Sequence, residues 1–280
     1  MSVDNFIPEI WAAATLAAIQ DHAVVAALCN RGYEGEARRG NAVNITGVIP
    51  PEVKDYKAAG RTTEAEEIED AATQVLIDQE KSFDFLVDDI DRTQAAGGFG
   101  DWTTAAGRSV ALDADRYITS RMVAEGTDAT STVTVHAEDG DSTHDVMRDM
   151  RKALSKASID AADRYFLMNP EFEALLLGSD AKITSVDTSG SPAGLREAII
   201  GRYLGFTLVP TNSLPEADVP QAVAFWAPAV AYVSQIDTVE AMRSHTKFAD
   251  RLRGLHVYGA RVLGLPGYNQ AVQVYTYPGS

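Results

Sequence analysis

The sequence contains one cysteine among 280 residues, and this scarcity limits its chemistry. A single thiol, Cys29, excludes an intramolecular disulfide and any metal site built from several cysteines. Cys29 lies on the apolar side of a predicted helix, which favours a buried, unreactive thiol over a nucleophile. This usage is typical of a chain that folds in a reducing cytoplasm.

Basic residues are also few, with 24 Lys and Arg against 40 Asp and Glu, which gives a formal charge of −16. Duplex DNA carries about one negative charge per 1.7 Å of its axis and repels so acidic a chain. We therefore do not expect tight DNA binding.

The sequence lacks long hydrophobic runs. No apolar run approaches the roughly 20 residues of a membrane-spanning helix, and Met1–Asn5 lacks the basic start of a signal peptide. We expect a soluble, non-secreted protein with no membrane partner.

Catalytic motifs are missing too. The five histidines (His22, His136, His144, His245 and His256) lack the spacing that places two imidazoles on one metal ion. Gly97–Gly100 lacks the lysine of a phosphate loop, and no GxSxG motif occurs. The sequence predicts no enzyme, no cofactor, no metal site and no catalytic residue.

One acidic group leaves an alternative open. Asp88, Asp89 and Asp91, with Glu34 or Glu36 nearby in space, form a candidate divalent-cation site for a hydrolase. Asp88 and Asp89 would point to opposite faces of a strand, so they are poorly placed to share a proton. A solvated strand edge, or pairing with arginines, is the interpretation we favour.

The residues that are present indicate a globular α+β protein, since 45% of the chain is apolar and helical and strand-like patterns are mixed. A left-handed cap at Gly126 and a capping box from Ser142 to Asp145 are expected. Asn169 should cap a short helix. Helices are predicted over 8–30, 104–125, a segment after Thr143, and 171–177, and strands over 164–168, 205–209, 222–226, 255–263 and 271–277.

Residues 43–91 are predicted to form a long strand pair that projects as an arm. Residues 43–46 and 83–88 alternate apolar and polar side chains, and the charged run 61–70 lies between them. No nearby segment supplies an evident core, so we expect the arm to pack on another element or another subunit.

Four stretches, in this order, carry a resemblance to a known family. They are residues 6–11 leading to 33–36, residues 85–94, residues 200–206 followed by 211–215, and residues 248–251 leading to 254–259. Arranged around a hairpin arm and a long helix, they make the chain resemble, over nearly its whole length, a major capsid protein of a tailed double-stranded DNA bacteriophage with the Hong Kong 97-type fold.

The resemblance implies four parts: an N-terminal arm (1–40), an extended loop (41–92), a peripheral domain (93–134 and 236–280) with a long spine helix, and an axial domain (135–235). In such shells, subunits form pentamers and hexamers, and the extended loop lies over a neighbour. The implied function is to build the icosahedral head that encloses the genome.

The resemblance also implies partners. These are further copies of the chain, a separate scaffolding protein, a portal and a decoration protein, with DNA enclosed but not tightly bound. Assembly would occur in the host cytoplasm, and the product is the virion. Lys54 and Lys57 lie in the loop, but no asparagine partner is identified, so no crosslink is assigned. An encapsulin-type compartment is the alternative within this fold.

Residue roles follow as hypotheses. The hinge residues are Gly40, Gly97, Gly98 and Gly100. The subunit contacts are Phe6, Trp11, Glu34, Glu36, Arg38, Arg39, Lys54, Asp55, Asp88, Asp89 and Asp91.

Overall fold

A computed structural model describes residues 15, 17–19, 23–34, 41–48, 53, 55–58, 61–62, 70–88, 100–178, 201–244, 246–265, 268 and 270–278. Its strands are β1 (Ala42–Val48), β2 (Asp70–Leu76), β3 (Gln79–Asp88), β4 (Thr127–Asp128), β5 (Arg164–Met168), β6 (Arg202–Tyr203), β7 (Phe206–Pro210), β8 (Gln221–Trp226), β9 (Val230–Arg243), β10 (Ala249–Val262) and β11 (Val272–Thr276). Its helices are α2 (Val25–Leu28), α4 (Gly100–Glu125), α5 (Gly140–Lys156), α6 (Pro170–Leu176) and the 3₁₀ turn η2 (Ala227–Ala229).

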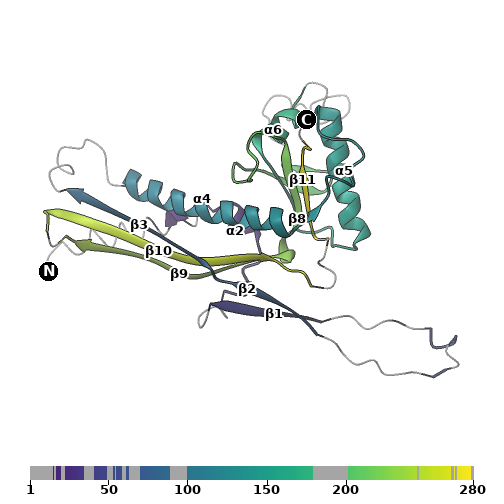
Figure 1. Ribbon diagram of the computed structural model, residues 1–280, viewed down its shortest axis with the longest axis horizontal. Helices are drawn as coiled ribbons and strands as arrows, with labels where there is room; N and C mark the ends of the chain where they lie inside the picture. The colour runs from purple at the N-terminus through teal and green to yellow at the C-terminus, as the bar shows by residue number, and fades with distance from the viewer. Residues whose placement is uncertain are drawn as a thin grey trace.

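Within the described residues the strands form three sheets. They are the pair β1-β2, a three-stranded sheet ordered β3-β10-β9, and a six-stranded sheet ordered β4-β11-β8-β5-β7-β6. Helix α4 lies along the three-stranded sheet, and a compact unit containing α5, α6, β8 and β11 stands at one end of α4 (Figure 1). This mixture confirms the α+β prediction.

The two predicted sides of the arm are both strands, but their predicted pairing is wrong. β1 pairs with β2 in antiparallel register, with Val43 opposite Val75. β3 instead pairs with β10, with Phe85 opposite Leu252. The sequence of β2, DAATQVL, alternates apolar and polar residues less clearly than β3 does. For this reason the prediction took β3, and not β2, as the partner of the first strand.

The base of the hairpin packs on distant segments of the same chain, which confirms the expectation that it packs on another element. Side chains from β1, β2, the start of β9, β10 and the chain that follows β10 are buried together. The core members are Val43, Ile45, Val75, Ile77, Ala231, Val233, Val257, Leu263 and Leu265. A second copy is therefore not needed to order this part of the hairpin.

Helix α4 confirms the predicted long helix and begins earlier, at Gly100. Its 26 residues span about 39 Å at 1.5 Å per residue. Ala114, Ile118 and Met122 form its buried face, at 2% exposure or less, as the spacing predicts.

The left-handed cap predicted at Gly126 is wrong. Among the described glycines, Gly205 has a positive φ and Gly126 does not. A Cβ atom at Gly126 would lie 2.5 Å from the carbonyl oxygen of Met122 and 2.7 Å from Cγ2 of Val274. Glycine is required at this position because α4 ends in close contact with β11.

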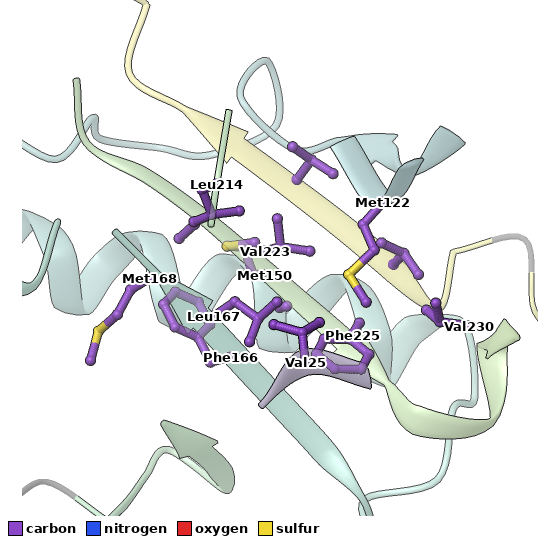
Figure 2. Packing of buried hydrophobic residues seen from close by; sticks show 14 of the residues in the cluster. Val25, Met122, Met150, Phe166, Leu167, Met168, Leu214, Val223, Phe225 and Val230 are labelled. Carbon is purple, nitrogen blue, oxygen red and sulfur yellow. The ribbon is translucent and has the colours of Figure 1, made fainter. Parts of the chain in front are cut away.

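The main core lies between the six-stranded sheet, α5 and the end of α4 (Figure 2). Phe166 and Leu167 of β5 and Phe225 of β8 are fully buried there, beside Met150 of α5. Complete burial of one such side chain contributes about 1.5–3 kcal/mol. This core fixes the compact unit to α4 through Met122.

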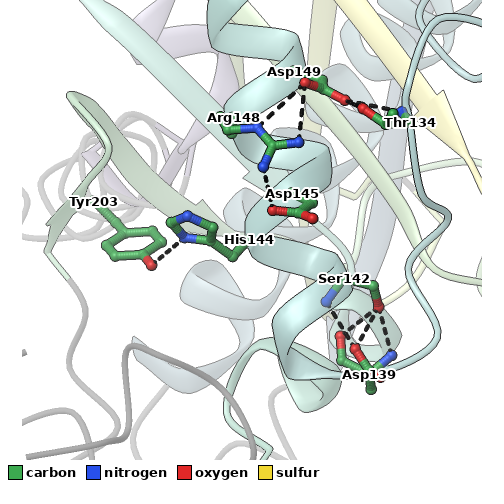
Figure 3. Close-up of polar contacts among 8 residues, drawn as sticks. All are labelled: Thr134, Asp139, Ser142, His144, Asp145, Arg148, Asp149 and Tyr203. Carbon is green, nitrogen blue, oxygen red and sulfur yellow. Dashed lines mark hydrogen bonds and ion pairs between the residues drawn. The ribbon is translucent and has the colours of Figure 1, made fainter. Parts of the chain in front are cut away.

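The two helices of this unit, α5 and α6, each begin at a side-chain N-cap. The predicted box from Ser142 to Asp145 is wrong: Asp139 is the N-cap, its Oδ1 accepts the N–H of Ser142 at 2.8 Å, and Ser142 Oγ accepts the N–H of Asp139 at 2.8 Å (Figure 3). Asn169 caps α6 as predicted, since its Oδ1 accepts the N–H of Phe172 at 2.9 Å.

The predicted helix over 8–30 is interrupted within the described residues. Residues 15 and 17–19 are helical, Ala23 and Val24 are not, and helix α2 follows. A carboxylate from α4 accepts backbone N–H groups at this break, and its geometry is given below. The sequence also left β9 unassigned over most of its length, although it is one of the two longest strands.

Sheet pairing cuts across the predicted chain division. Strand β11, within the 236–280 segment assigned to the peripheral part, pairs with β8 of the six-stranded sheet. The remaining strands of that sheet, apart from β4, come from residues 164–226. The C-terminal strand therefore belongs to the sheet of the compact unit.

Replacing Gly259 with alanine should destabilise the protein by about 1–3 kcal/mol, because its Cβ would overlap the carbonyl oxygen of Leu76 where β2 crosses β10. Gly264→Ala is the matched control, since a Cβ there meets nothing within 4 Å. Urea unfolding of both variants measures the difference, and equal midpoints would contradict this account of the crossing.

Candidate assembly surfaces

The predicted contact residues divide into those that the structure describes and those that it does not. Glu34, Asp55 and Asp88 are described, as is the backbone of Gly100 at the first position of α4. Outside the described residues lie Phe6, Trp11, Glu36, Arg38, Arg39, Lys54, Asp89, Asp91, Gly40, Gly97 and Gly98.

Glu34 lies in a turn beside the body. Its Oε1 accepts a hydrogen bond from Nε of Arg31 at 2.7 Å, and the Arg31 guanidinium lies 5.9 Å from the ring centre of Tyr232. Tyr232 is a buried residue of β9. Glu34 is thus paired within its own chain.

Asp55 organises a turn in the loop between β1 and β2. Its Oδ1 accepts the N–H of Lys57 at 2.9 Å and of Ala58 at 3.2 Å. Val53 and Tyr56 on either side are 98% and 54% exposed. The described part of this loop therefore presents apolar side chains that the chain itself does not cover.

Asp88 and Glu34 lie at opposite ends of the three-stranded sheet. The turn of Glu34 follows a backbone bridge to Ala231, near the start of β9 and the carboxyl end of β10. Asp88 pairs with Ala249, the first residue of β10. The 14 residues of β10 put roughly 40 Å between these positions at about 3.3 Å per residue.

The structure therefore overturns the proximity of Asp88 and Glu34 on which the cation site partly depended. Across the described part of the chain, no group of three or more His, Cys, Asp or Glu is placed to hold a metal ion.

Reactive side chains have structural partners. Cys29 is buried, its Sγ donates to the carbonyl oxygen of Val25 at 3.3 Å, and burial raises the pKa of the thiol, as expected of an inert cysteine. His256 is buried with Nε2 3.1 Å from the hydroxyl of Tyr232. His144 Nδ1 lies 2.5 Å from the Tyr203 hydroxyl (Figure 3).

Helix α4 is joined to the three-stranded sheet by tyrosine–carboxylate hydrogen bonds. The hydroxyl of Tyr258 on β10 donates to Asp113 at 2.7 Å, and the hydroxyl of Tyr117 on α4 donates to Asp78, the residue before β3, at 2.7 Å. Burial together with the Asp78 carboxylate raises the pKa of Tyr117 to about 12. These phenols stay protonated at neutral pH and hold the helix on the sheet.

Asp115 of α4 is a buried carboxylate that the sequence analysis missed. Its Oδ2 accepts the N–H of Val24 and its Oδ1 the N–H of Ala26, both at 2.9 Å. Burial raises the pKa of Asp115, although these backbone N–H groups act to lower it. Asp115 therefore ties the N-terminal segment to the long helix.

The outward face of the three-stranded sheet mixes ion pairs with exposed leucines. Arg253 Nη2 lies 2.5 Å from Glu240 Oε2, and Arg251 pairs with Asp84 across β10 and β3. Leu86 and Leu255, on the same face, are 49% and 40% exposed. The alternation in β3 and β10 could have identified this face from the sequence.

This face holds a shallow depression of about 460 Å³. Its lining residues are Ser82, Phe83, Asp84, Thr238, Glu240, Arg251, Arg253, Gly254 and Leu255. A broad, mixed surface of this kind suits contact with another protein better than enclosure of a small substrate. No helix among the described residues is long and apolar enough to cross a membrane.

An elongated body, a rooted hairpin with exposed apolar side chains, and an open sheet face define a structural subunit built for association. The chain belongs to the phage capsid protein family, whose model matches residues 69–268. This membership confirms the predicted Hong Kong 97-type fold and the predicted role as a major capsid protein of an icosahedral phage shell.

Solved phage structures are similar to this chain. A chain from Mycobacterium phage Che8 is similar at 47% identity, with a TM-score of 0.80 over 92% of each chain. The capsid of cyanophage P-SCSP1u shares the fold at 15% identity and a TM-score of 0.69, over 86% and 85% of the two chains.

The virus-like particle of Pyrococcus furiosus shares the fold at 13% identity and a TM-score of 0.61, over 95% and 98% of the two chains. A comparison with curated protein sequences finds no match.

Replacing Asp115 with alanine should lower the free energy of unfolding by about 1–3 kcal/mol for each N–H left without a partner. Asp115→Asn keeps one acceptor oxygen and should cost less. Asp218→Ala, in an exposed loop, removes the same charge and should change stability by less than about 0.5 kcal/mol. Calorimetry of the three variants ranks their stabilities. If Asp115→Ala were as stable as the wild type, Asp115 would not hold the N-terminal segment on α4.

The raised pKa of Asp115 also sets a pH dependence. A carboxyl whose pKa is higher in the folded state contributes its full stability below the unfolded value, and loses it as pH rises through the folded value. Relative to Asp115→Asn, the wild type should therefore become less stable as pH rises above about 4. Parallel urea titrations between pH 3.5 and 7 measure this, and a constant difference would contradict it.

Proposed function

We propose that this capsid protein builds its shell through pentamers and hexamers in which the extended loop of one subunit lies over the body of the next. The observation that carries the proposal is the hairpin between β1 and β2. Its base is buried in its own chain, whereas Val53 and Tyr56 farther along the loop are exposed. Burial of such side chains requires another molecule.

The subunit contacts predicted from the sequence remain proposals. Asp55 fits a contact role because it shapes the exposed turn of the loop. Asp88 fits one because it lies at the far end of the sheet from the hairpin. The division into arm, extended loop, peripheral and axial domains is likewise proposed, with β11 moved to the axial part because it pairs with β8.

The partners beyond the chain itself are inferred from the family. We infer a separate scaffolding protein, a portal and a decoration protein, with assembly in the host cytoplasm. The chain would act without catalysis. Its charge of −16 supports a wall that encloses DNA without binding it tightly.

The hinge role of Gly40, Gly97, Gly98 and Gly100 stays a prediction of the sequence. It supposes that the arm and the loop rotate about glycines next to the body while shells mature.

Sedimentation and negative-stain electron microscopy of the expressed protein, alone and with its scaffold candidate, test the assembly function. Shells, tubes or capsomer rings are expected. A monomer under every condition would contradict it. Closed shells that form without scaffold and carry a bound cargo protein would favour an encapsulin-type compartment instead.

Replacing residues 50–68 with a short Gly-Ser turn should leave a folded monomer, because β1, β2 and the core at the base of the hairpin are retained. Shell formation should be lost. Circular dichroism and thermal unfolding serve as the folding control. Normal shells from a folded variant would show that the loop is not an assembly contact.

A further inference from the structure

Two segments connect the N-terminal arm and the extended loop, which we call the appendages, to the body. We call residues 23–30 the arm root and residues 42–47 with 71–77 the hairpin root. Both are described in the structure, and each is held by apolar burial together with polar contacts to α4, β9 or β10.

The arm root is part of the main core. Val25, Ala26 and Cys29 are buried at 7% exposure or less. Asp115 accepts two of its backbone N–H groups, as described above. Asn30 then joins β9 through its backbone, donating to the carbonyl oxygen of Val230 at 2.8 Å and accepting the N–H of Tyr232 at 3.0 Å. The root therefore touches the helix, the core and the sheet.

The hairpin root is buried to a similar extent. Val43, Ile45 and Val75 are at most 3% exposed. A Cβ on Gly47 would lie 2.9 Å from Cδ2 of Leu265, so β1 lies directly on the chain that follows β10.

On the other strand of the hairpin root, Arg261 Nη1 donates to the carbonyl oxygen of Gln74 at 2.7 Å. Detaching the hairpin root would expose the core at the base of the hairpin and leave Arg261 without this acceptor.

These attachments constrain the linkers between the fixed elements. Residues 31–41 join the arm root to the hairpin root, so rotation about Gly40 would re-aim neither appendage while both roots stay in place. Residues 89–99 join β3 to α4, and both of these elements are held against β10. A change near Gly97 and Gly98 would likewise leave the hairpin where it is.

We propose that both roots stay fixed to the body as one rigid unit while shells form and mature, so that the arm and the loop are re-aimed only beyond the roots. This inference rests on the proposed assembly function. It replaces the hinges assigned from the sequence, because packed cores transmit motion as rigid bodies.

A reversible disulfide tests the hairpin root. In a Cys29→Ala background, cysteines at positions 47 and 265 would be close enough to bond, since a Cβ at 47 lies 3.3 Å from Cγ of Leu265. The control pair, Asn44→Cys with Gln74→Cys, links two exposed partners within the hairpin and not to the body.

With the 47–265 bond formed, the yield and size of shells should match the reduced protein within about twofold. Loss of shells on oxidation, restored by reductant and absent from the control pair, would overturn the inference. Failure of the wild-type protein to form any shell would count against the assembly function itself.

Hydrogen exchange of the wild-type protein gives an independent measurement if the cysteine pair blocks folding. Amides of residues 24–30, 42–47 and 71–77 should be equally protected in free subunits and in shells. A tenfold or greater loss of protection at either root in shells would show that the root detaches, and would overturn the inference.

Discussion

Burial of both faces of β10 from His256 to Ala260 is the interaction on which the rest of the structure depends. On one face, Tyr258 packs edge-on against Tyr117 and donates to Asp113, which holds α4. On the other, Val257 enters the core at the base of the hairpin. The edges of β10 pair with β3 and β9. One strand thus orders the helix, the sheet and the hairpin.

This arrangement separates rigid parts of the subunit from surfaces left for other copies. The hairpin root covers the inner end of the sheet's outward face, where Val257 is buried, and leaves Leu255 and Leu86 exposed farther out. The compact unit with α5 and α6 is closed by its own core at the C-terminal end of α4 (Figure 1). A capsid subunit needs this combination, because contacts between copies are reproducible only when the surfaces that make them are held in fixed positions.

Much of the local structure could be predicted because its causes are local. The apolar spacing of Ala114, Ile118 and Met122 specified the long helix, and Asn169 before Pro170 specified a capped one. Prediction failed where distant segments meet. The partner of β1 depended on a core shared with Leu263 and Leu265, and the break before α2 depended on a carboxylate about ninety residues away.

The candidate contacts were predicted less well than the fold. Asp88, Asp89 and Asp91 were grouped because they are dense in sequence, and Glu34 or Glu36 was expected nearby in space. Asp88 and Glu34 instead lie at opposite ends of the three-stranded sheet. Conversely, the exposed sheet face was not recognised, because Leu86 was assigned to an isolated arm and Leu255 to a separate strand with no assigned partner. Family resemblance carried the functional conclusion where residue patterns gave no site, and the family match to residues 69–268 supports it.

A cryo-electron microscopy reconstruction of assembled particles tests the central claim most directly. The account predicts that residues 42–48 lie on β10 of their own subunit, while the loop beyond them lies over the body of an adjacent copy. A reconstruction in which the whole hairpin has left its own β10, or in which the loop folds back on its own subunit, would contradict it.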